Sequence, residues 1–377
     1  MLFRSRSPSF FGRAKKLGDR LEKSTECYAT AIISGNQTNK VWALRSAGLG
    51  VLANLPGKAK AVACIEDTAV ALEDLAEYID EFTELMKGYG QEAVYYAHAG
   101  AGEIHLRPIL DLKVSTDRQL FHDITRDVAL LVKKYRGSLS GEHGDGRVRA
   151  SFIPLMLGDK MYEELRQIKR VFDPQNIFNP GKIVDAPPMN ESLRYEADQA
   201  QPVYDTTLDF SSHGGLLELA EKCNGSGDCR KVSGGVMCPS YRATRQEKDS
   251  TRGRANALRE ILTREHDNSP FTHPILEEAL DLCLSCKACT AECPSIVDMS
   301  SLKAEYLHQR HQQTRIPWRY WLFANIDQVY RLGSKWPGLF NWGLKIAGPI
   351  KSLLGVAKER SLPPVARQTL RKWYHAN

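Results

Sequence analysis

Several common sequence signals are missing from this chain of 377 residues. No run approaches the roughly 18 consecutive apolar residues that a membrane-spanning helix needs. The basic start, residues 1–16, has no apolar core and no small-residue cleavage site, so it does not resemble a secretory signal. No GxGxxG motif follows an expected strand, which argues against a Rossmann dinucleotide site. We therefore expect a cytoplasmic protein.

A net positive charge is lacking in the body of the chain. The formal net charge is +6, but residues 301–377 alone hold 13 Lys or Arg and three acids, so the preceding residues are slightly acidic. Because no basic groove with interleaved aromatics occurs there, we expect no nucleic-acid partner. Five of the six tryptophans also lie in this tail. We expect the tail to be helical and either to lie peripherally on the inner membrane or to pack on another domain.

Cysteine is rare outside one segment. Seven of the nine cysteines lie between Cys223 and Cys293. In a chain without a secretory signal, such clustering favours metal or cluster ligation over disulfides. Cys27 and Cys64 stand alone, and we expect them to be small buried apolar residues.

The last four cysteines form an iron–sulfur motif. Their spacing is C-x2-C-x2-C-x3-C-P, a run in which three cysteines hold one cluster and the fourth reaches another. With this crossed pattern, a 4Fe-4S cluster is expected on four cysteines: Cys238, Cys283, Cys286 and Cys289.

A second cluster has fewer candidate ligands. Cys223 and Cys229 fit the first and third places of another run, but Ser226 occupies the middle place. Together with Cys293 they offer three thiolates, one short of a full set. Three alternatives stay open: a three-iron cluster, a non-cysteine ligand, or no second cluster.

Two glycine-rich segments predict a separate divalent metal site. His98 and His105 flank a small-residue turn in AHAGAGEIH, and Glu142 and His143 stand in GEHGDG. Two imidazoles and one carboxylate leave an open coordination position, as a catalytic Zn or Mn site requires. His143 then stands beside the ion as a base. The alternative is that these histidines are ordinary core or surface residues.

The alternation of strand and helix patterns predicts an α+β fold for residues 13–184. We expect helices at about 13–23, 41–52, 72–87, 118–135 and 159–171, and strands at about 27–35, 60–70, 92–99 and 103–112. The remaining segments are expected to be a disordered start (1–12), a linker (185–215), a small α-helical ferredoxin-type iron–sulfur domain (216–300) and the basic helical tail (301–377).

These motifs resemble those of a known family. The HAGAG-x-x-H motif, the GEHG loop and the FDPQNIFNPGK ending are similar to the C-terminal, substrate-side domain of FAD-linked 2-hydroxy acid oxidoreductases. That family includes the glycolate oxidase FAD subunit, D-lactate dehydrogenases and D-2-hydroxyglutarate dehydrogenase. The resemblance covers about residues 42–184, and residues 223–297 resemble the iron–sulfur region that follows in large bacterial fusions.

The resemblance implies roles for single residues. The metal ligands fall on His98, His105 and Glu142, and the general base falls on His143. The family's substrate-carboxylate arginine lies in a W-x-L-R stretch, which corresponds to Arg45; its alternative is a surface arginine.

The resemblance also implies that FAD lies close to Asn179, in the NPGK-like ending, and to Gly144, in the GEHG loop. The common GHxGDGN pattern is AHAGAGE here, which leaves the choice of substrate open. The family's N-terminal flavin-binding domain has no counterpart in the sequence. The chain is therefore expected to be the middle of a longer enzyme, or to use a separate FAD-binding domain or subunit.

The expected function is FAD-dependent oxidation of a D-2-hydroxy acid to the 2-oxo acid. The substrate class is lactate, glycolate or 2-hydroxyglutarate, and electrons pass through iron–sulfur clusters to an acceptor or a quinone-linked partner. The main alternative is an iron–sulfur electron-transfer fragment of a split or truncated dehydrogenase, without activity of its own. A zinc hydrolase on the same ligands is disfavoured because the cluster domain would have no purpose.

Overall fold

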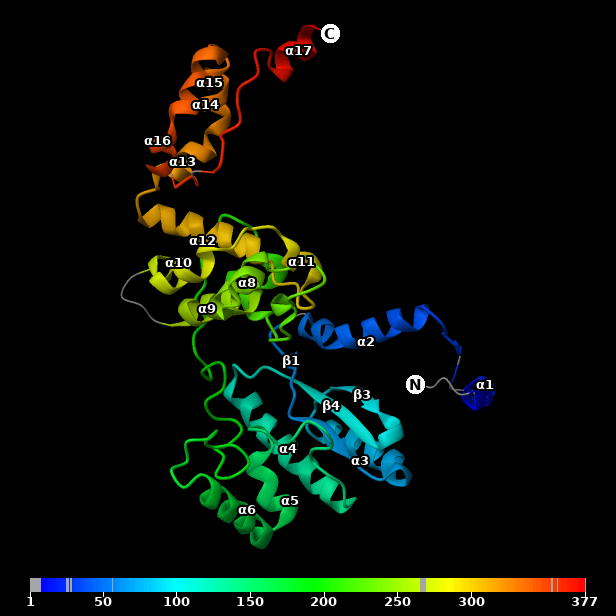
Figure 1. Ribbon diagram of the computed structural model, residues 1–377. Coiled ribbons are helices and arrows are strands. Elements are labelled where there is room, and N and C mark those ends of the chain that lie inside the picture. Colours follow the sequence, from blue (N-terminus) through cyan, green and yellow to red (C-terminus); the bar gives the residue numbers. More distant parts are fainter. Residues whose placement is uncertain are drawn as a thin grey trace.

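The computed structural model describes residues 8–24, 27, 29–55, 57–264, 269–353, 355–357 and 359–376. Figure 1 shows three parts in succession: a lobe with a small sheet, a lobe of short helices, and a group of tail helices that projects from the second lobe. Helix α1 (Pro8–Glu22) begins inside the segment 1–12 that the sequence predicts to be disordered. Residues 1–7 lie outside the described residues.

The sheet is antiparallel and centred on one strand. Strand β4 (Glu103–Leu110) pairs with β1 (Lys60–Ala61), β2 (Ile65–Ala69) and β3 (Ala93–His98). The expected strands at 92–99 and 103–112 are therefore confirmed, whereas the single strand expected at 60–70 is split into β1 and β2. The expected strand at 27–35 is wrong, because the described residues of this segment pair with no neighbour and leave Ile32 and Ile33 exposed.

One face of the sheet builds the first core. Ile104 and Leu106 of β4 are buried in a cluster with Phe82 of α3 (Leu75–Gly88) and Val128 of α4 (Ser115–Lys134). Since side chains alternate along a strand, the residues between them point to the opposite face. That opposite face carries the polar side chains of the site.

Two further helices complete this lobe, α5 (Ile153–Leu157) and α6 (Asp159–Phe172). Helix α6 has no buried residue, and large apolar side chains on it and in the loop that follows are exposed, with Phe172 at 80% and Phe178 at 71%. Helix α2 (Gln37–Ala53) precedes the sheet and reaches the second lobe, where the side-chain amide of Asn54 donates to the carbonyl oxygen of Pro294 at 3.0 Å.

The second lobe packs six helices around the cysteines. They are α7 (Leu216–Glu221), α8 (Pro239–Thr244), α9 (Thr251–Thr263), α10 (Pro274–Asp281), α11 (Ala288–Glu292) and α12 (Met299–Gln313). Its core includes four of the cysteines as well as leucines and isoleucines of α7, α9 and α10. Arg254 is buried here and donates to the carbonyl oxygen of Ala279 at 2.8 Å and to Ser240 Oγ at 2.9 Å. The expected α+β lobe and the small helical lobe are both confirmed.

The tail is helical, as the sequence predicts. Its helices are α13 (Trp318–Ala324), α14 (Ile326–Gly333), α15 (Pro337–Ile346), α16 (Gly348–Leu353) and α17 (Leu370–Ala376). All five of its tryptophans are more than half exposed. Within the part of the chain that the structure describes, no helix is long and apolar enough to cross a membrane.

Candidate metal and iron–sulfur sites

The β3–β4 hairpin places the histidines on the polar face of the sheet. In its register His98 lies opposite Glu103, and Tyr96 lies opposite His105. The turn between the strands needs glycine at position 102, where φ is 73° and a Cβ would lie 2.1 Å from the carbonyl oxygen of Val70. The tight turn thus returns the chain so that both histidines face the same side.

The structure brings the three expected metal ligands together. One ligand atom each from His98, His105 and Glu142 lies within 4.8 Å of the others. Ligand atoms about 2.1 Å from one ion lie up to about 4 Å apart, so a small closure makes this set a coordination shell. Burial, and the neighbouring rings of His98 and His143, lower the pKa of His105, which favours the neutral imidazole that binds a metal. The donor set therefore fits a divalent ion.

His143 lies beside this group, where the sequence places a base. Its Nε2 is 3.5 Å from Glu142 Oε1, and its ring stacks on that of His105 with centroids 5.3 Å apart. The side chain of His143 is 43% exposed, whereas that of His105 is only 4% exposed. His105 is thus buried as a metal ligand would be, whereas the ring of His143 is accessible to a substrate.

A buried aspartate that sequence reasoning missed holds the GEHG loop. Asp67 Oδ1 accepts from the backbone N–H of Glu142 at 2.7 Å, and Oδ2 accepts from that of His143 at 2.9 Å. Ser140 Oγ donates to the same carboxylate at 2.6 Å. Burial alone would raise the pKa of Asp67, but these hydrogen bonds outweigh it and hold the pKa below its usual value. The one available signal was the pair of adjacent acids, Glu66 and Asp67, in the middle of the expected strand at residues 60–70.

The charge of Asp67 is balanced by a second buried residue. Arg149 lies with its NH2 nitrogen 3.5 Å from Asp67 Oδ2 and donates to the carbonyl oxygens of Glu66 and Gly144. Asp67 itself has φ at 87°, at the point where the β2–β4 register shifts. An irregularity in the edge strand thus aims this carboxylate at the loop.

Glu103 is a second carboxyl group that the sequence did not assign to the site. It is 7% exposed, and its Oε1 lies 3.9 Å from His105 Nε2 and has no hydrogen-bond partner among the described residues. Burial and the nearby acids Asp67 and Glu142 raise its pKa to about 7. It therefore holds a proton at weakly acidic pH in the metal-free protein.

The expected substrate arginine reaches the same place from α2. The NH2 nitrogen of Arg45 lies 3.5 Å from both ring nitrogens of His98. A second arginine, Arg107, is buried on the same face of β4, where it pairs with Glu66 and lies over the ring of Tyr96. Arg107 thus already has a carboxylate partner, and the binding of a substrate carboxylate by Arg45 stays a prediction.

The two expected FAD residues lie on exposed loops. Gly144 follows His143 directly, with φ at 78° and open space around its α-carbon. Asn179, with φ at 52°, lies in the loop after α6, whose backbone N–H groups at Ile177 and Phe178 donate to Asp173 at 2.8 Å. Among the described residues, no hydrogen bond joins Asn179 to the three expected metal ligands, His98, His105 and Glu142. Its role in flavin binding therefore stays a prediction.

The four cysteines of the expected first cluster line a single small cavity. Cys283 and Cys286 come from the loop before α11, and Cys289 lies in α11 itself. Cys238 directly precedes α8 and stands 45 residues before Cys283 in the sequence. The thiol of Cys238 also accepts from the backbone N–H of Thr251 at 3.1 Å, at the start of α9. The arrangement fits the crossed pattern.

The other three cysteines form a second group. Burial raises the pKa of Cys223 and of Cys229, and their own charges and that of Cys293 add to this effect. The backbone N–H of Arg252 donates to Cys229 Sγ at 3.4 Å. Ser226, in the place of a fourth cysteine, is exposed, and its N–H is bound to Asn224 Oδ1. The charge of Cys293 thus acts on both Cys223 and Cys229, and the three alternatives for a second cluster stay open.

Comparisons with known proteins define the class of each lobe. Residues 13–183 match the family of FAD linked oxidases, C-terminal domain, and residues 219–297 match the 4Fe-4S dicluster domain. The chain therefore contains the C-terminal domain of an FAD-linked oxidase followed by a 4Fe-4S dicluster domain, and the resemblance seen in the sequence is confirmed. These two domains support FAD and an iron–sulfur cluster as cofactors.

Individual relatives of this chain include D-2-hydroxyglutarate dehydrogenases and a D-lactate dehydrogenase. The chain is 32% identical over 346 residues to a D-2-hydroxyglutarate dehydrogenase of Pantoea ananatis, which covers 81% of this chain and 33% of the relative. It is 33% identical over 342 residues to the Escherichia coli enzyme of the same name, with coverage of 80% and 33%. A D-lactate dehydrogenase of Archaeoglobus fulgidus is 35% identical over 34% of this chain and 28% of its own length. The chain thus spans about a third of the length of the D-2-hydroxyglutarate dehydrogenases that it matches.

Proposed function

We propose that this chain forms the substrate side and the electron exit of an enzyme that oxidises a D-2-hydroxy acid to the 2-oxo acid with FAD. The observation that carries the proposal is the convergence of His98, His105 and Glu142, with His143 beside them, in a domain of the FAD-linked oxidase family. The names of the relatives favour 2-hydroxyglutarate within the lactate, glycolate and 2-hydroxyglutarate class.

Each residue of the group has a defined task in this proposal. A divalent Zn or Mn ion, when bound, lowers the pKa of the substrate hydroxyl. His143 takes the hydroxyl proton at a ring nitrogen, because an imidazole titrates near neutral pH. Arg45 binds the substrate carboxylate through its guanidinium group. Asp67 fixes the backbone on which Glu142 and His143 stand, so that the base keeps its distance from the ion.

Two cofactors complete the reaction. FAD, when bound, would supply the acceptor for the hydride at C2 of the substrate, and clusters in the iron–sulfur lobe would supply a route by which electrons leave singly. The large exposed apolar side chains of α6 and its following loop, including Phe172 and Phe178, support a docking face for a separate FAD-binding domain or subunit. Asn179 lies in that loop and Gly144 in the GEHG loop, so both belong to the surfaces that we assign to flavin contact.

The test is cofactor analysis followed by turnover. Anaerobically purified protein is assayed for flavin, iron, sulfide, zinc and manganese, then supplied with FAD and an artificial acceptor, and offered D- and L-2-hydroxyglutarate, lactate and glycolate. The proposal expects turnover with a D-2-hydroxy acid and not with its L enantiomer. Bound metal, bound flavin and no oxidation of any of these acids would contradict it.

The alternative is that the chain is only an electron-transfer unit. The observation that favours it is that Cys238 lines one cavity with the three later cysteines, whereas no hydrogen bond among the described residues joins Asn179 to the metal ligands. Reversible reduction of the clusters in a preparation that neither binds FAD nor oxidises a 2-hydroxy acid supports this alternative.

The tail supports a contact with a surface outside the chain. Its exposed tryptophans and basic residues suit an anionic lipid surface, as expected for a protein that is peripheral on the inner membrane. Cosedimentation with anionic vesicles at low salt, lost at high salt, supports lipid contact. No binding at either salt concentration supports packing against another protein domain instead.

A further inference from the structure

Glu103 lies beside the metal group at the start of β4. It precedes His105 by two positions, and Ile104 between them is in the core, so Glu103 and His105 both point to the polar face of the sheet. Across the hairpin Glu103 lies opposite His98, a placement that brings the Cβ atoms of two residues to about 5 Å. Glu103 therefore has one expected metal ligand beside it on each strand of the hairpin.

Glu103 differs from the other buried acids of the described residues, which are Asp67, Asp173, Asp249 and Glu305. Each of those acids accepts at least one hydrogen bond from an N–H or O–H group. No described N–H or O–H group donates to either carboxyl oxygen of Glu103, and its Oε1 is buried without a partner. Because a buried carboxylate is costly unless it is paired or coordinates a metal, Glu103 requires a cation whenever it is charged.

Among the described residues, no cationic side chain is available to Glu103. Arg107, two positions further along β4, is paired with Glu66, and Arg149 lies against Asp67. Both buried arginines of this face therefore already neutralise another acid. A metal ion is the cation that the neighbouring histidines can bring to Glu103.

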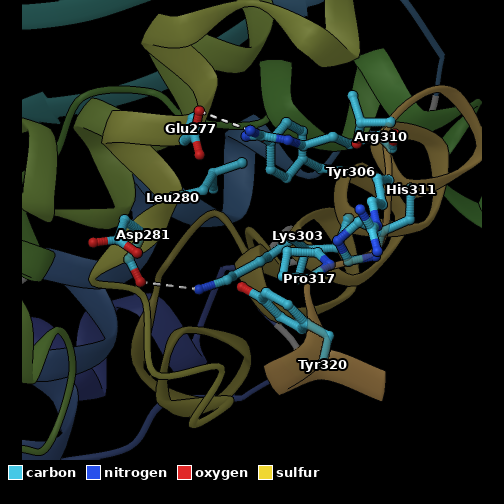
Figure 2. A pocket seen from close by; sticks show the side chains of 12 residues that line it. Glu277, Leu280, Asp281, Lys303, Tyr306, Arg310, His311, Pro317 and Tyr320 are labelled. Atoms are coloured by element: carbon cyan, nitrogen blue, oxygen red, sulfur yellow. Dashed lines mark hydrogen bonds and ion pairs between the residues drawn. The ribbon is translucent and has the colours of Figure 1, made fainter. Parts of the chain in front are cut away.

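The cavity between α10, α12 and α13 has the opposite arrangement (Figure 2). Glu277 on its wall is paired with Arg310 at 2.8 Å, and Lys303 donates to the carbonyl oxygen of Asp281 at 3.2 Å. The protein itself thus supplies the partners of these charged groups. The unpartnered buried carboxyl group is at the metal group instead, at Glu103.

The distance between Glu103 and His105 fits two ligands of one ion. Glu103 Oε1 lies 3.9 Å from His105 Nε2, which is too long for a hydrogen bond. Two donor atoms that are each about 2.1 Å from one ion lie up to about 4 Å apart. An ion at the group of His98, His105 and Glu142 therefore comes within reach of Glu103 through the same small closure that the three ligands require.

We propose that Glu103 is a fourth ligand of the divalent ion and that it shifts the preference of this site from Zn²⁺ toward Mn²⁺. The presence of a metal ion at this group rests on the proposed function. Four protein ligands fill the shell of a four-coordinate zinc ion and leave no position for a substrate. A six-coordinate ion keeps two positions, which match the hydroxyl and carboxylate oxygens of a 2-hydroxy acid, and carboxylate ligands suit Mn²⁺.

The test is a metal titration that needs neither flavin nor a hydroxy acid. The full, cluster-loaded chain is dialysed against a chelator and titrated with MnCl2, and the electron paramagnetic resonance signal of free Mn²⁺ gives the affinity. Competition with Zn²⁺ gives the affinity for zinc. Glu103→Gln should lower the Mn²⁺ affinity at least about tenfold. It should lower the Zn²⁺ affinity far less, because three protein ligands are enough for a catalytic zinc site.

Glu77→Gln, at an exposed position of α3, is the matched control and should leave both affinities unchanged. Water proton relaxation of the Mn²⁺-loaded protein supplies a second readout, which a merely structural role of Glu103 would not move. Glu103→Gln should add about one water molecule to the bound Mn²⁺, because a lost carboxylate ligand leaves its position to water.

The outcomes separate this inference from the proposed function. Equal affinities in Glu103→Gln and the wild type overturn the inference alone, and so does an equal loss of affinity for both ions. A wild type that binds neither Mn²⁺ nor Zn²⁺ overturns the metal site of the proposed function as well. None of these measurements depends on turnover of a 2-hydroxy acid.

Discussion

The carboxylate of Asp67 accepts a hydrogen bond from the backbone N–H of His143 at 2.9 Å, across 76 residues of sequence. A buried acid on an edge strand thereby fixes the loop that presents the proposed base. The same carboxylate binds the N–H of Glu142, so the metal ligand and the base share one support.

The first prediction concerns this support. Asp67→Asn replaces one accepting oxygen by an NH2 group that faces backbone donors, so the loop loses a charge-assisted hydrogen bond. We expect the free energy of unfolding to fall by about 1–3 kcal/mol and the metal affinity to fall by about 10- to 100-fold. Urea unfolding and metal titration measure the two effects. Asp80→Asn, at an exposed position on α3, should change neither.

The second prediction separates the base from the ligands. His143→Ala should lower kcat by about 10²- to 10⁴-fold, because proton abstraction loses its general base, while the bound metal per chain is unchanged. Steady-state turnover measures kcat, and elemental analysis of the same preparation measures the bound metal per chain. His308→Ala, on an exposed face of α12, is the control. Full turnover in His143→Ala would remove it from the mechanism.

The third prediction concerns pH. The pKa of Glu103 is about 7 in the folded, metal-free protein, above its value of 4.5 in an unfolded chain. The folded state therefore binds the extra proton, and its contribution to stability is full below pH 4.5 and is lost as pH rises toward 7. We expect Glu103→Gln to flatten this part of the stability profile. An unchanged slope between pH 5 and 7 in chemical unfolding would show that Glu103 is ionised in the fold.

The fourth prediction tests the crossed arrangement of the cysteines. Cys238→Ala should remove the first cluster, because Cys238 shares a cavity with Cys283, Cys286 and Cys289. Cys223→Ala should leave that cluster intact. Iron and sulfide per chain, with the electron paramagnetic resonance spectrum of the reduced protein, distinguish the two variants. Equal cluster loss in both would contradict the assignment.

The fifth prediction concerns the hairpin turn. Gly102→Ala would place a Cβ 2.1 Å from the carbonyl oxygen of Val70 at a φ of 73°, so the turn must shift. We expect a loss of about 2 kcal/mol or more in the free energy of unfolding. Gly100→Ala meets nothing within 4 Å and is the matched control. Thermal unfolding of the two variants provides the comparison, and equal midpoints would argue against the strained turn.

The sequence predicted the metal group because its chemistry is local: glycine-rich turns carry histidines at the ends of strands that the alternation pattern reveals. It could not predict the support by Asp67, because that depends on a shift in strand register and on a loop 73 to 76 residues away. The same limit explains the mistaken strand at 27–35. Its composition suits a strand, but a strand exists only where a partner satisfies its backbone groups, and no local pattern reports a missing partner.

The cysteine spacing was a stronger signal, since the crossed pattern fixes partners that are far apart in sequence. The cavity shared by Cys238 and the three later cysteines has the geometry which that pattern expects.

The most direct test of the account is the metal content of the wild type beside that of His98→Ala and Glu142→Ala. Both side chains are about half exposed, so the variants should fold. The difference between each variant and the wild type isolates this site from metal held by the cysteines. We predict about one zinc or manganese ion per chain that is lost in both variants. A wild type without such an ion, or an ion that both variants retain, would contradict the central claim.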